Sequence, residues 1–195
     1  MISLDIERLI TPITDSNPAG PSLRYETIYD EIREARRGDD ANLPQGVWEI
    51  GLKHPDWATV IKLCVEGLEN QSKDLQLAIW LTEAATYQFG YTGLVDGCKV
   101  IHQLLVTFWE TLHPLIDEDE DLSARITCLE WFCDRVSLAV SISPLTQTSL
   151  SSNVTYHLAD WRKALGAKRR GSDTAQDEGN TSTNPPVTID RATVR

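Results

Sequence analysis

The chain has 195 residues, of which 41% are hydrophobic, and it carries a net charge of −11. This length is enough to bury a sizeable core in one compact domain. Residues 162–195 hold seven Lys/Arg against four Asp/Glu, or +3, which leaves −14 for residues 1–161. So acidic a body argues against nucleic acid or an anionic membrane as the principal partner, because phosphate binding depends on basic side chains.

Cysteine usage and hydropathy indicate a cytoplasmic protein. No apolar run approaches the ~20 residues that cross a bilayer, so we expect no membrane insertion. The four cysteines form no Cys-x-x-Cys pair, and each stands beside apolar residues. We therefore expect buried free thiols rather than disulfides or a metal site, at Cys64, Cys98, Cys128 and Cys133.

The first fifty residues predict two helices separated by a loop. A short amphipathic helix fits residues 3–10 and a longer one fits 27–37, with Gly38 ending it. Between them, residues 15–22 carry two prolines, a glycine and short polar side chains, which is typical of a loop. Pro18 and Gly20 allow this loop to turn sharply and set Tyr25 against the helix that follows. Arg24 either braces the turn or belongs to a docking loop.

The central part of the chain predicts three further helices. One begins at Pro55, a residue suited to the first helical position, and its apolar stripe starts at Trp57. The next spans 73–89: Ser72 caps it, Asp74 lies in its first turn, and the run through Leu75, Trp80 and Leu81 has almost no polar interruption. A helix of that kind is buried on most of its circumference, although Trp80 could instead line a partner groove.

From Leu94, apolar residues recur at positions 94, 98, 101, 105, 108 and 112, which predicts a helix that packs nearly antiparallel to a neighbour. Pro114 helps to close this helix. We assign Gly93 and Gly97 to turn and close-packing positions and Trp109 to the core.

An acidic segment follows, consisting of Asp117, Glu118, Asp119, Glu120 and Asp121. It lacks the alternating ligands and central glycine of a calcium loop, so a solvated loop is the plain interpretation. It leads into a helix at about 122–140, with positions 126, 129, 133, 136 and 140 facing inward, and Arg125 can pair with Asp121. Electrostatically, this segment is also the best candidate for contact with a basic partner surface. Arg24, through the docking loop, is the other candidate partner-binding residue.

The end of the chain loses its large apolar residues. Residues 143–153 predict a loop, and 154–158 fit either a short extended piece or the start of a last helix. Beyond Gly166 the composition cannot offset the entropy of ordering, so we expect a disordered tail. The expected fold is all-α: a single helical bundle-like domain of about six helices over residues 1–165, with a disordered tail over 166–195.

No catalytic, cofactor or metal site emerges from the sequence. The four histidines are scattered, and there is no His-Glu-x-x-His, Walker loop or Gly-x-Gly-x-x-Gly. We therefore expect no enzyme. Two alternatives stay open: a generic acidic helical adaptor, and a cytosolic hydrolase whose site is assembled from separated His and carboxylate residues.

Several segments together resemble the N-terminal domain of the ImpA/TssA proteins of the bacterial type VI secretion system. They run in order from about residue 10 to 140, and the likeness continues more loosely through 156–161. The matching segments are Asn17–Tyr25, Asp30–Arg37, Pro55–Trp57, Ser72–Ala85, Gly90–Gly97, Phe108–Pro114 and Asp117–Asp121 with Arg125.

The resemblance implies a non-catalytic scaffold or docking module that assists baseplate and tail tube/sheath assembly. The partners it implies are baseplate, membrane-complex and tail tube/sheath proteins, and a homo-oligomer is possible. Proteins of this family usually continue into a C-terminal ring-forming region. The sequence ends at Arg195 without a segment that resembles this C-terminal region, so we expect either a truncated form or a short relative.

Overall fold

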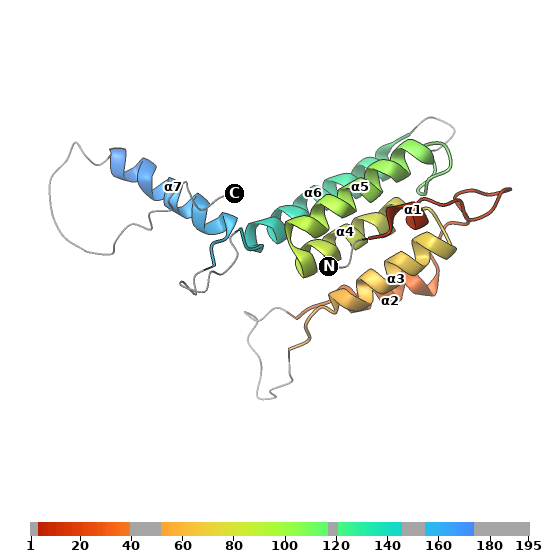
Figure 1. Ribbon diagram of the computed structural model, residues 1–195, viewed down its shortest axis with the longest axis horizontal. Helices are drawn as coiled ribbons and strands as arrows, with labels where there is room; N and C mark the ends of the chain where they lie inside the picture. Colours follow the sequence, from red (N-terminus) through yellow and green to blue (C-terminus); the bar gives the residue numbers. More distant parts are fainter. Residues whose placement is uncertain (1–3, 40–51, 117–120, 146–154, 174–195) are drawn as a thin grey trace. The chain divides into compact units, whose positions relative to one another are not determined.

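The computed structural model describes residues 4–39, 52–116, 121–145 and 155–173, with the side chains of the last helix described as far as Gly166. Within these ranges the protein is helical, with no strand and two isolated bridges, so the prediction of an all-α fold is confirmed (Figure 1). The helices are α1 (Ile6–Leu9), α2 (Thr27–Arg36), α3 (Trp57–Asn70), α4 (Leu75–Phe89), α5 (Tyr91–Thr107), α6 (Ser123–Ile142) and α7 (Leu158–Asp173).

The chain separates into two compact units, Met1–Ser137 and Leu138–Arg195. In the second unit, the backbone N–H of Leu145 donates to Tyr156 O at 2.8 Å. The last helix begins at Leu158 and extends to Asp173, beyond residue 166, where we expected a disordered tail to begin. The remainder of the expected tail, 174–195, lies outside the described residues, and the domain boundary at residue 165 stays a prediction.

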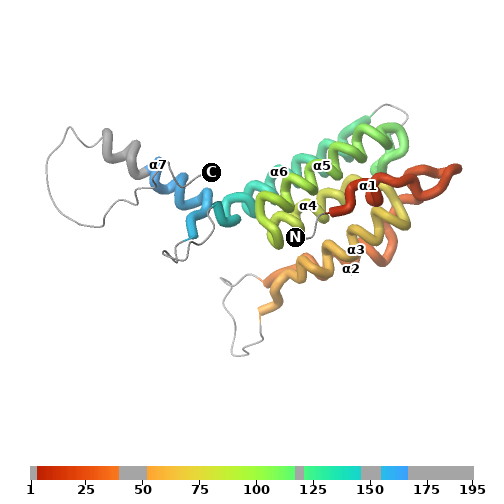
Figure 2. Tube along the Cα trace, viewed as in Figure 1, coloured from red at the N-terminus to blue at the C-terminus, as the bar shows by residue number. Residues whose placement is uncertain are grey.

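Helix α4 is the centre of the first unit. It packs against both α3 and α5 (Figure 1), and α2 packs against α3 (Figure 2). Leu77, Ala78, Ile79 and Leu81 are all fully buried, so nearly the whole circumference of α4 is covered. Covering a helix that is apolar all round removes its side chains from water on every side, which is the main contribution to stability here.

The polar start of α4 differs in detail from the expected cap. Asp74, rather than Ser72, is the N-cap residue, and its Oδ1 accepts the backbone N–H of Gln76 at 2.8 Å. Ser72 Oγ is buried without a hydrogen-bond partner. A similar offset occurs at α3, where Asp56 is the cap and Pro55 precedes it. In both cases a carboxylate takes the position, because it accepts exposed amide hydrogens and also suits the helix dipole.

Glycines, not the larger apolar residues, bring α5 against α4. A Cβ on Gly93 would lie 2.1 Å from Ala85 O, and one on Gly97 would lie 2.4 Å from Thr82 Oγ1. The buried stripe of α5 therefore passes through Gly93, Gly97, Val100 and Leu104, while Cys98 is exposed. The inward face that we predicted for this helix began at positions 94 and 98, one residue after the buried positions 93 and 97. The prediction used only bulky apolar residues, and glycine has no side chain to include.

The inward face of α6 also differs from the expected one. Ile126 is 50% exposed and Cys133 is exposed, whereas Val136 and Ala139 are buried. Arg125 occupies the inward position near the start of the helix and is 3% exposed. A buried charged residue breaks the apolar pattern, and for that reason the pattern assigned the wrong face.

Candidate interaction site

The acidic segment that we singled out is described only at its last residue. Positions 117–120 lie outside the described residues. Asp121 accepts the backbone N–H of Ser123 and its hydroxyl, each at 2.8 Å, and these hydrogen bonds hold the pKa of the Asp121 carboxyl below its usual range. Asp121 therefore stabilises the start of α6.

Arg125 does not pair with Asp121. Its guanidinium donates instead to three backbone carbonyls in the segment after α5: Pro114 O at 2.8 Å, Trp109 O at 2.9 Å and Leu112 O at 2.5 Å. The planar fork of five donors suits a cluster of carbonyls that have no other partner at a helix end. Arg125 thus ties the start of α6 to the end of α5 and is unsuited to contact a partner.

Two expected core aromatics lie at the surface. Tyr25 is 92% exposed, and the Arg24 guanidinium lies 5.9 Å from the centre of its ring. Leu23, which is 3% exposed, takes the anchoring position at this turn instead. Trp109 is 42% exposed, and the Arg125 guanidinium carbon lies 5.0 Å from the centre of its ring.

The other motif residues lie within the body of the unit. Gly20 has a φ of 71°, and a Cβ there would come within 2.2 Å of Gln71 O, so only glycine fits this turn. Pro18 O accepts the backbone N–H of Ile13 at 2.9 Å. Trp57 stacks on Tyr87 with ring centres 4.4 Å apart. Leu75, Trp80 and Leu81 are buried, and Pro114 follows a cis peptide bond.

Three motif segments meet at a buried joint before α4. The backbone N–H of Lys73 donates to Ala19 O at 2.6 Å, and that of His113 donates to Lys73 O at 3.1 Å. Leu75 N–H in turn donates to His113 O at 2.8 Å, and His113 Nε2 lies 3.0 Å from Gly20 O. The residues that carry the family resemblance therefore bond mainly to one another, which is a structural use of the motifs.

Lys73 is the most unusual residue of this joint. Its side chain is fully buried, and Nζ donates to Leu9 O at 2.9 Å and to Leu68 O. Neither acceptor is a carboxylate. Burial lowers the pKa of Lys73 to about 8, although Glu69 opposes this shift. Ammonium donors can satisfy carbonyls that lack another partner, but an ammonium in the core costs free energy.

Asp74 joins α2 to this region. Tyr29 Oη donates to Asp74 Oδ2 at 2.7 Å, in addition to the helix-capping bond that Asp74 accepts. Burial raises the pKa of the Asp74 carboxyl, while the Tyr29 hydrogen bond opposes this rise. Burial, and then the Asp74 charge, also raise the pKa of Tyr29. The pair is enclosed between helices and fastens them together.

A second buried pair crosses from α2 to α4. Arg36 Nη2 lies 2.7 Å from Glu83 Oε2, and the guanidinium carbon is 5.3 Å from the ring centre of Trp80 and 4.8 Å from that of Trp131. Burial raises the pKa of Glu83, and Arg36 opposes this rise. The arginine thereby links α2, α4 and α6 through one charged group and two aromatic faces. Neither Arg36 nor Glu83 carried any sequence signal for this role.

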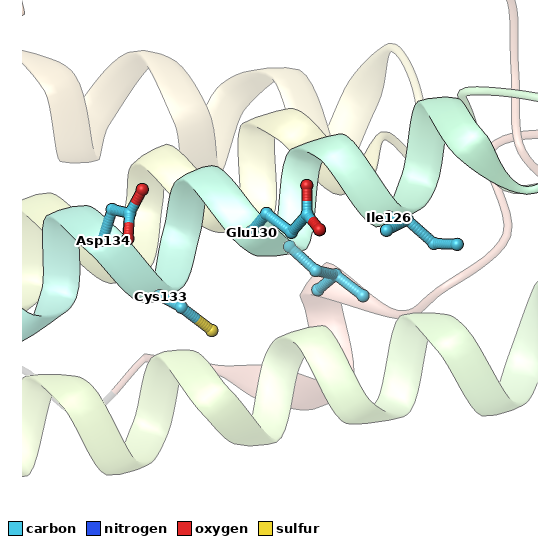
Figure 3. A pocket seen from close by; sticks show the side chains of 5 residues that line it. Ile126, Glu130, Cys133 and Asp134 are labelled. Carbon is cyan, nitrogen blue, oxygen red and sulfur yellow. The ribbon is translucent and has the colours of Figure 1, made fainter.

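The surface offers shallow apolar hollows away from these buried groups. One of about 450 Å³ follows α5 and is lined by Leu94, Val95, Cys98, Lys99, His102 and Gln103. Another of about 510 Å³ follows α6 and is lined by Ile126, Leu129, Glu130, Cys133 and Asp134 (Figure 3). The buried ionisable residues Lys73, Asp74 and Glu83 line neither hollow. Within the described ranges, no three His, Cys, Asp or Glu side chains form a group able to hold a metal ion.

No described helix is both long and apolar enough to span a membrane. The four cysteines are free thiols, but only Cys64 is fully buried; Cys98 and Cys133 are exposed and Cys128 is half-buried. The expectation that all four are buried was therefore wrong for the two exposed ones, which lie on the outward faces of α5 and α6.

Comparison with known proteins identifies relatives over most of the first unit. The chain is 31% identical over 118 residues to the type VI secretion system component TssA1 of Pseudomonas aeruginosa, covering 60% of this chain and 34% of that protein. It is 29% identical to the N-terminal domain, including the conserved ImpA_N region, of the TssA component from Burkholderia cenocepacia. That structural match has a TM-score of 0.69 and covers 91% of this chain and 66% of the solved one.

The chain thus spans about a third of the length of the curated relative and just under two thirds of the solved chain. Residues 10–134 match the family model for ImpA, N-terminal, type VI secretion system. This segment contains the buried joint and both hollows, and the chain belongs to that family.

Proposed function

We propose that this chain is a non-catalytic docking module of the type VI secretion system, which assists assembly of the baseplate and of the tail tube and sheath. The observation that carries the proposal is the placement of the polar chemistry. The buried ionisable side chains Lys73, Asp74, Glu83 and Arg125 bond to other groups of the protein, while outward side chains of α5 and α6 form open apolar hollows. Such an arrangement supports contact with proteins rather than bond making.

The family adds the context in which such contacts occur. Relatives are named as components of the secretion apparatus. The partners that we propose are accordingly baseplate, membrane-complex and tube or sheath proteins, reached from the cytoplasmic side. The net charge of −11 favours partners with basic surfaces, because complementary charge speeds encounter and rejects like-charged competitors.

Affinity capture from cells that carry the secretion apparatus tests this function. The tagged chain is compared with a variant in which residues 117–120 are changed to Asn and Gln, with Asp121 kept because it stabilises α6. Recovery of baseplate, membrane-complex or sheath proteins at low salt, reduced in the variant, is the expected result. Recovery of metabolic enzymes alone, or of nothing, contradicts the proposal. Equal recovery by both forms removes the acidic segment from the contact and leaves the docking function standing.

A further inference from the structure

Helix α6 is apolar on more sides than the protein covers. Val136 and Arg125 face inward, and Trp131 and Phe132 pack partly against the core. On the other side Ile126 is 50% exposed and Cys133 is exposed. A helix with apolar residues around its circumference is normally covered on all sides, and no residue in the described part of the chain covers the outward face of α6.

The hollow on this face has a definite chemical character. Its lining residues stand at positions 126, 129, 130, 133 and 134, the spacing of one helix face. Ile126 and Cys133 are exposed, and Leu129, which also packs partly against the core, completes an apolar floor. The Glu130 and Asp134 carboxylates lie on the same side of α6 (Figure 3), and among the described residues neither forms an ion pair.

These two carboxylates are one helical turn apart and repel each other. A cation placed beside them removes that repulsion, while apolar side chains next to it cover Ile126 and Leu129. From 126 to 134 the helix rises about 12 Å, which matches two turns of a partner helix. A partner helix with apolar side chains three and four residues apart therefore fits the apolar floor, and Lys or Arg residues beside them fit the acidic edge.

We propose that this α6 hollow binds a basic amphipathic helix of a partner protein. The inference rests on the proposed docking function and names the chemistry of one of its contacts. Complementary charge favours a basic helix over a second copy of this chain as the occupant of the hollow. A second copy of the chain would bring another acidic body, of net charge −11, to an edge that is already acidic.

Two natural thiols make the proposal measurable. Cys133 lies in the α6 hollow, whereas Cys98 lies in the separate hollow on α5, and both are exposed. The probe is a synthetic amphipathic peptide with leucines along one face and lysines beside them. Its binding is expected to slow alkylation of Cys133 several-fold while leaving the rate at Cys98 unchanged, as mass spectrometry of each peptide reports.

Matched variants separate this site from general attraction between opposite charges. The double variant Glu130→Lys/Asp134→Lys is expected to weaken peptide binding about tenfold or more, as is Ile126→Ser. The control Glu31→Lys/Glu66→Lys makes the same charge change at exposed positions of α2 and α3 and is expected to weaken binding only about twofold. Leu115→Ser, at a residue 53% exposed, controls for lost apolar surface.

Three results would overturn the inference. The first is absence of binding, and the second is equal weakening by the control charge variants. The third is a dimer in analytical ultracentrifugation that Ile126→Ser dissociates, since a second copy would then occupy the face. Capture of secretion components by a chain that fails the peptide test removes only this inference. Peptide binding without such capture removes the proposed secretion role instead.

Discussion

Gly97 lies at a close approach of α5 to α4. A Cβ there would lie 2.4 Å from Thr82 Oγ1 and 2.5 Å from Thr82 Cγ2. We predict that Gly97→Ala lowers the free energy of unfolding by about 1–3 kcal/mol, because overpacking forces the two helices apart. Urea unfolding measures the loss. Adding Thr82→Ala removes Oγ1 and Cγ2 but keeps the Cβ at position 82, which would still lie 2.7 Å from the new methyl group, so it should restore part of the lost stability. A double variant no better than Gly97→Ala would show that the contact is not the cause.

Lys73 predicts a dependence of stability on pH. Its pKa is about 8 in the folded protein against 10.5 ordinarily. Below pH 8 the Lys73 amine is protonated in both the folded and the unfolded protein, and folding then bears the full free-energy cost of burying the charged ammonium group. Between pH 8 and 10.5 the folded state releases the proton while the unfolded state keeps it, so stability rises with pH.

We therefore predict that Lys73→Met removes a rise of roughly 1–2 kcal/mol in unfolding free energy between pH 7.5 and 9.5. The measurement is urea unfolding of wild type and variant at both pH values, because subtraction cancels the cysteines and other shared groups. Lys62→Met, at an exposed position of α3, serves as the control and should retain the wild-type rise. An identical pH dependence in Lys73→Met and wild type would contradict the argument.

At the scale of elements, the Arg36–Glu83 pair holds α2, α4 and α6 together. The Glu83 side chain is 4% exposed and that of Arg36 is 16% exposed. We predict that Arg36→Met costs about 3–5 kcal/mol, since it leaves a carboxylate buried without its partner. Changing both residues to Met should cost clearly less than the single change, because no unpaired charge then remains. A double variant as unstable as Arg36→Met would locate the loss in the aromatic contacts instead.

The helices were predictable because most of their segments repeat apolar residues at helical spacing between recognisable stops. The buried α4 is the clearest case: an apolar run between Asp74 and Gly90, both of which are its caps. Register was less predictable. In α5 the inward residues Gly93 and Gly97 have no side chain, and in α6 the inward Arg125 is charged. The hydrophobic pattern therefore predicted the buried face of each helix only in part.

The candidate site was less predictable than the fold. Tyr25 and Trp109 are exposed while Leu23 and Arg125 beside them or after them in the chain are buried, and nothing in the local sequence indicates this. The extent of α7 to Asp173 could not be predicted from apolar spacing, because its last turns are polar and basic, although Arg, Lys and Ala favour helix. The α6 hollow follows from which face of the helix is left uncovered, and that is a tertiary property.

At the scale of the whole molecule, the family match and the enclosed polar groups lead to the same account. Residues 10–134 match the ImpA N-terminal family, and the motif residues in that span mostly bond to one another. A family can therefore keep these motifs for the sake of a rigid body while its contacts are made by other, outward side chains. Such a structural use of the motifs supports the docking role that we propose.

Photo-crosslinking in cells that assemble the secretion apparatus tests the proposed docking function most directly. A photoreactive residue is placed in turn at Tyr25, Val106 and Ile126, all of which are exposed. The buried Leu81 position is the control. We predict adducts with baseplate, membrane-complex or sheath proteins from at least one outward position and none from position 81. Adducts with metabolic enzymes alone, or none from any outward position of a folded and abundant chain, would contradict it.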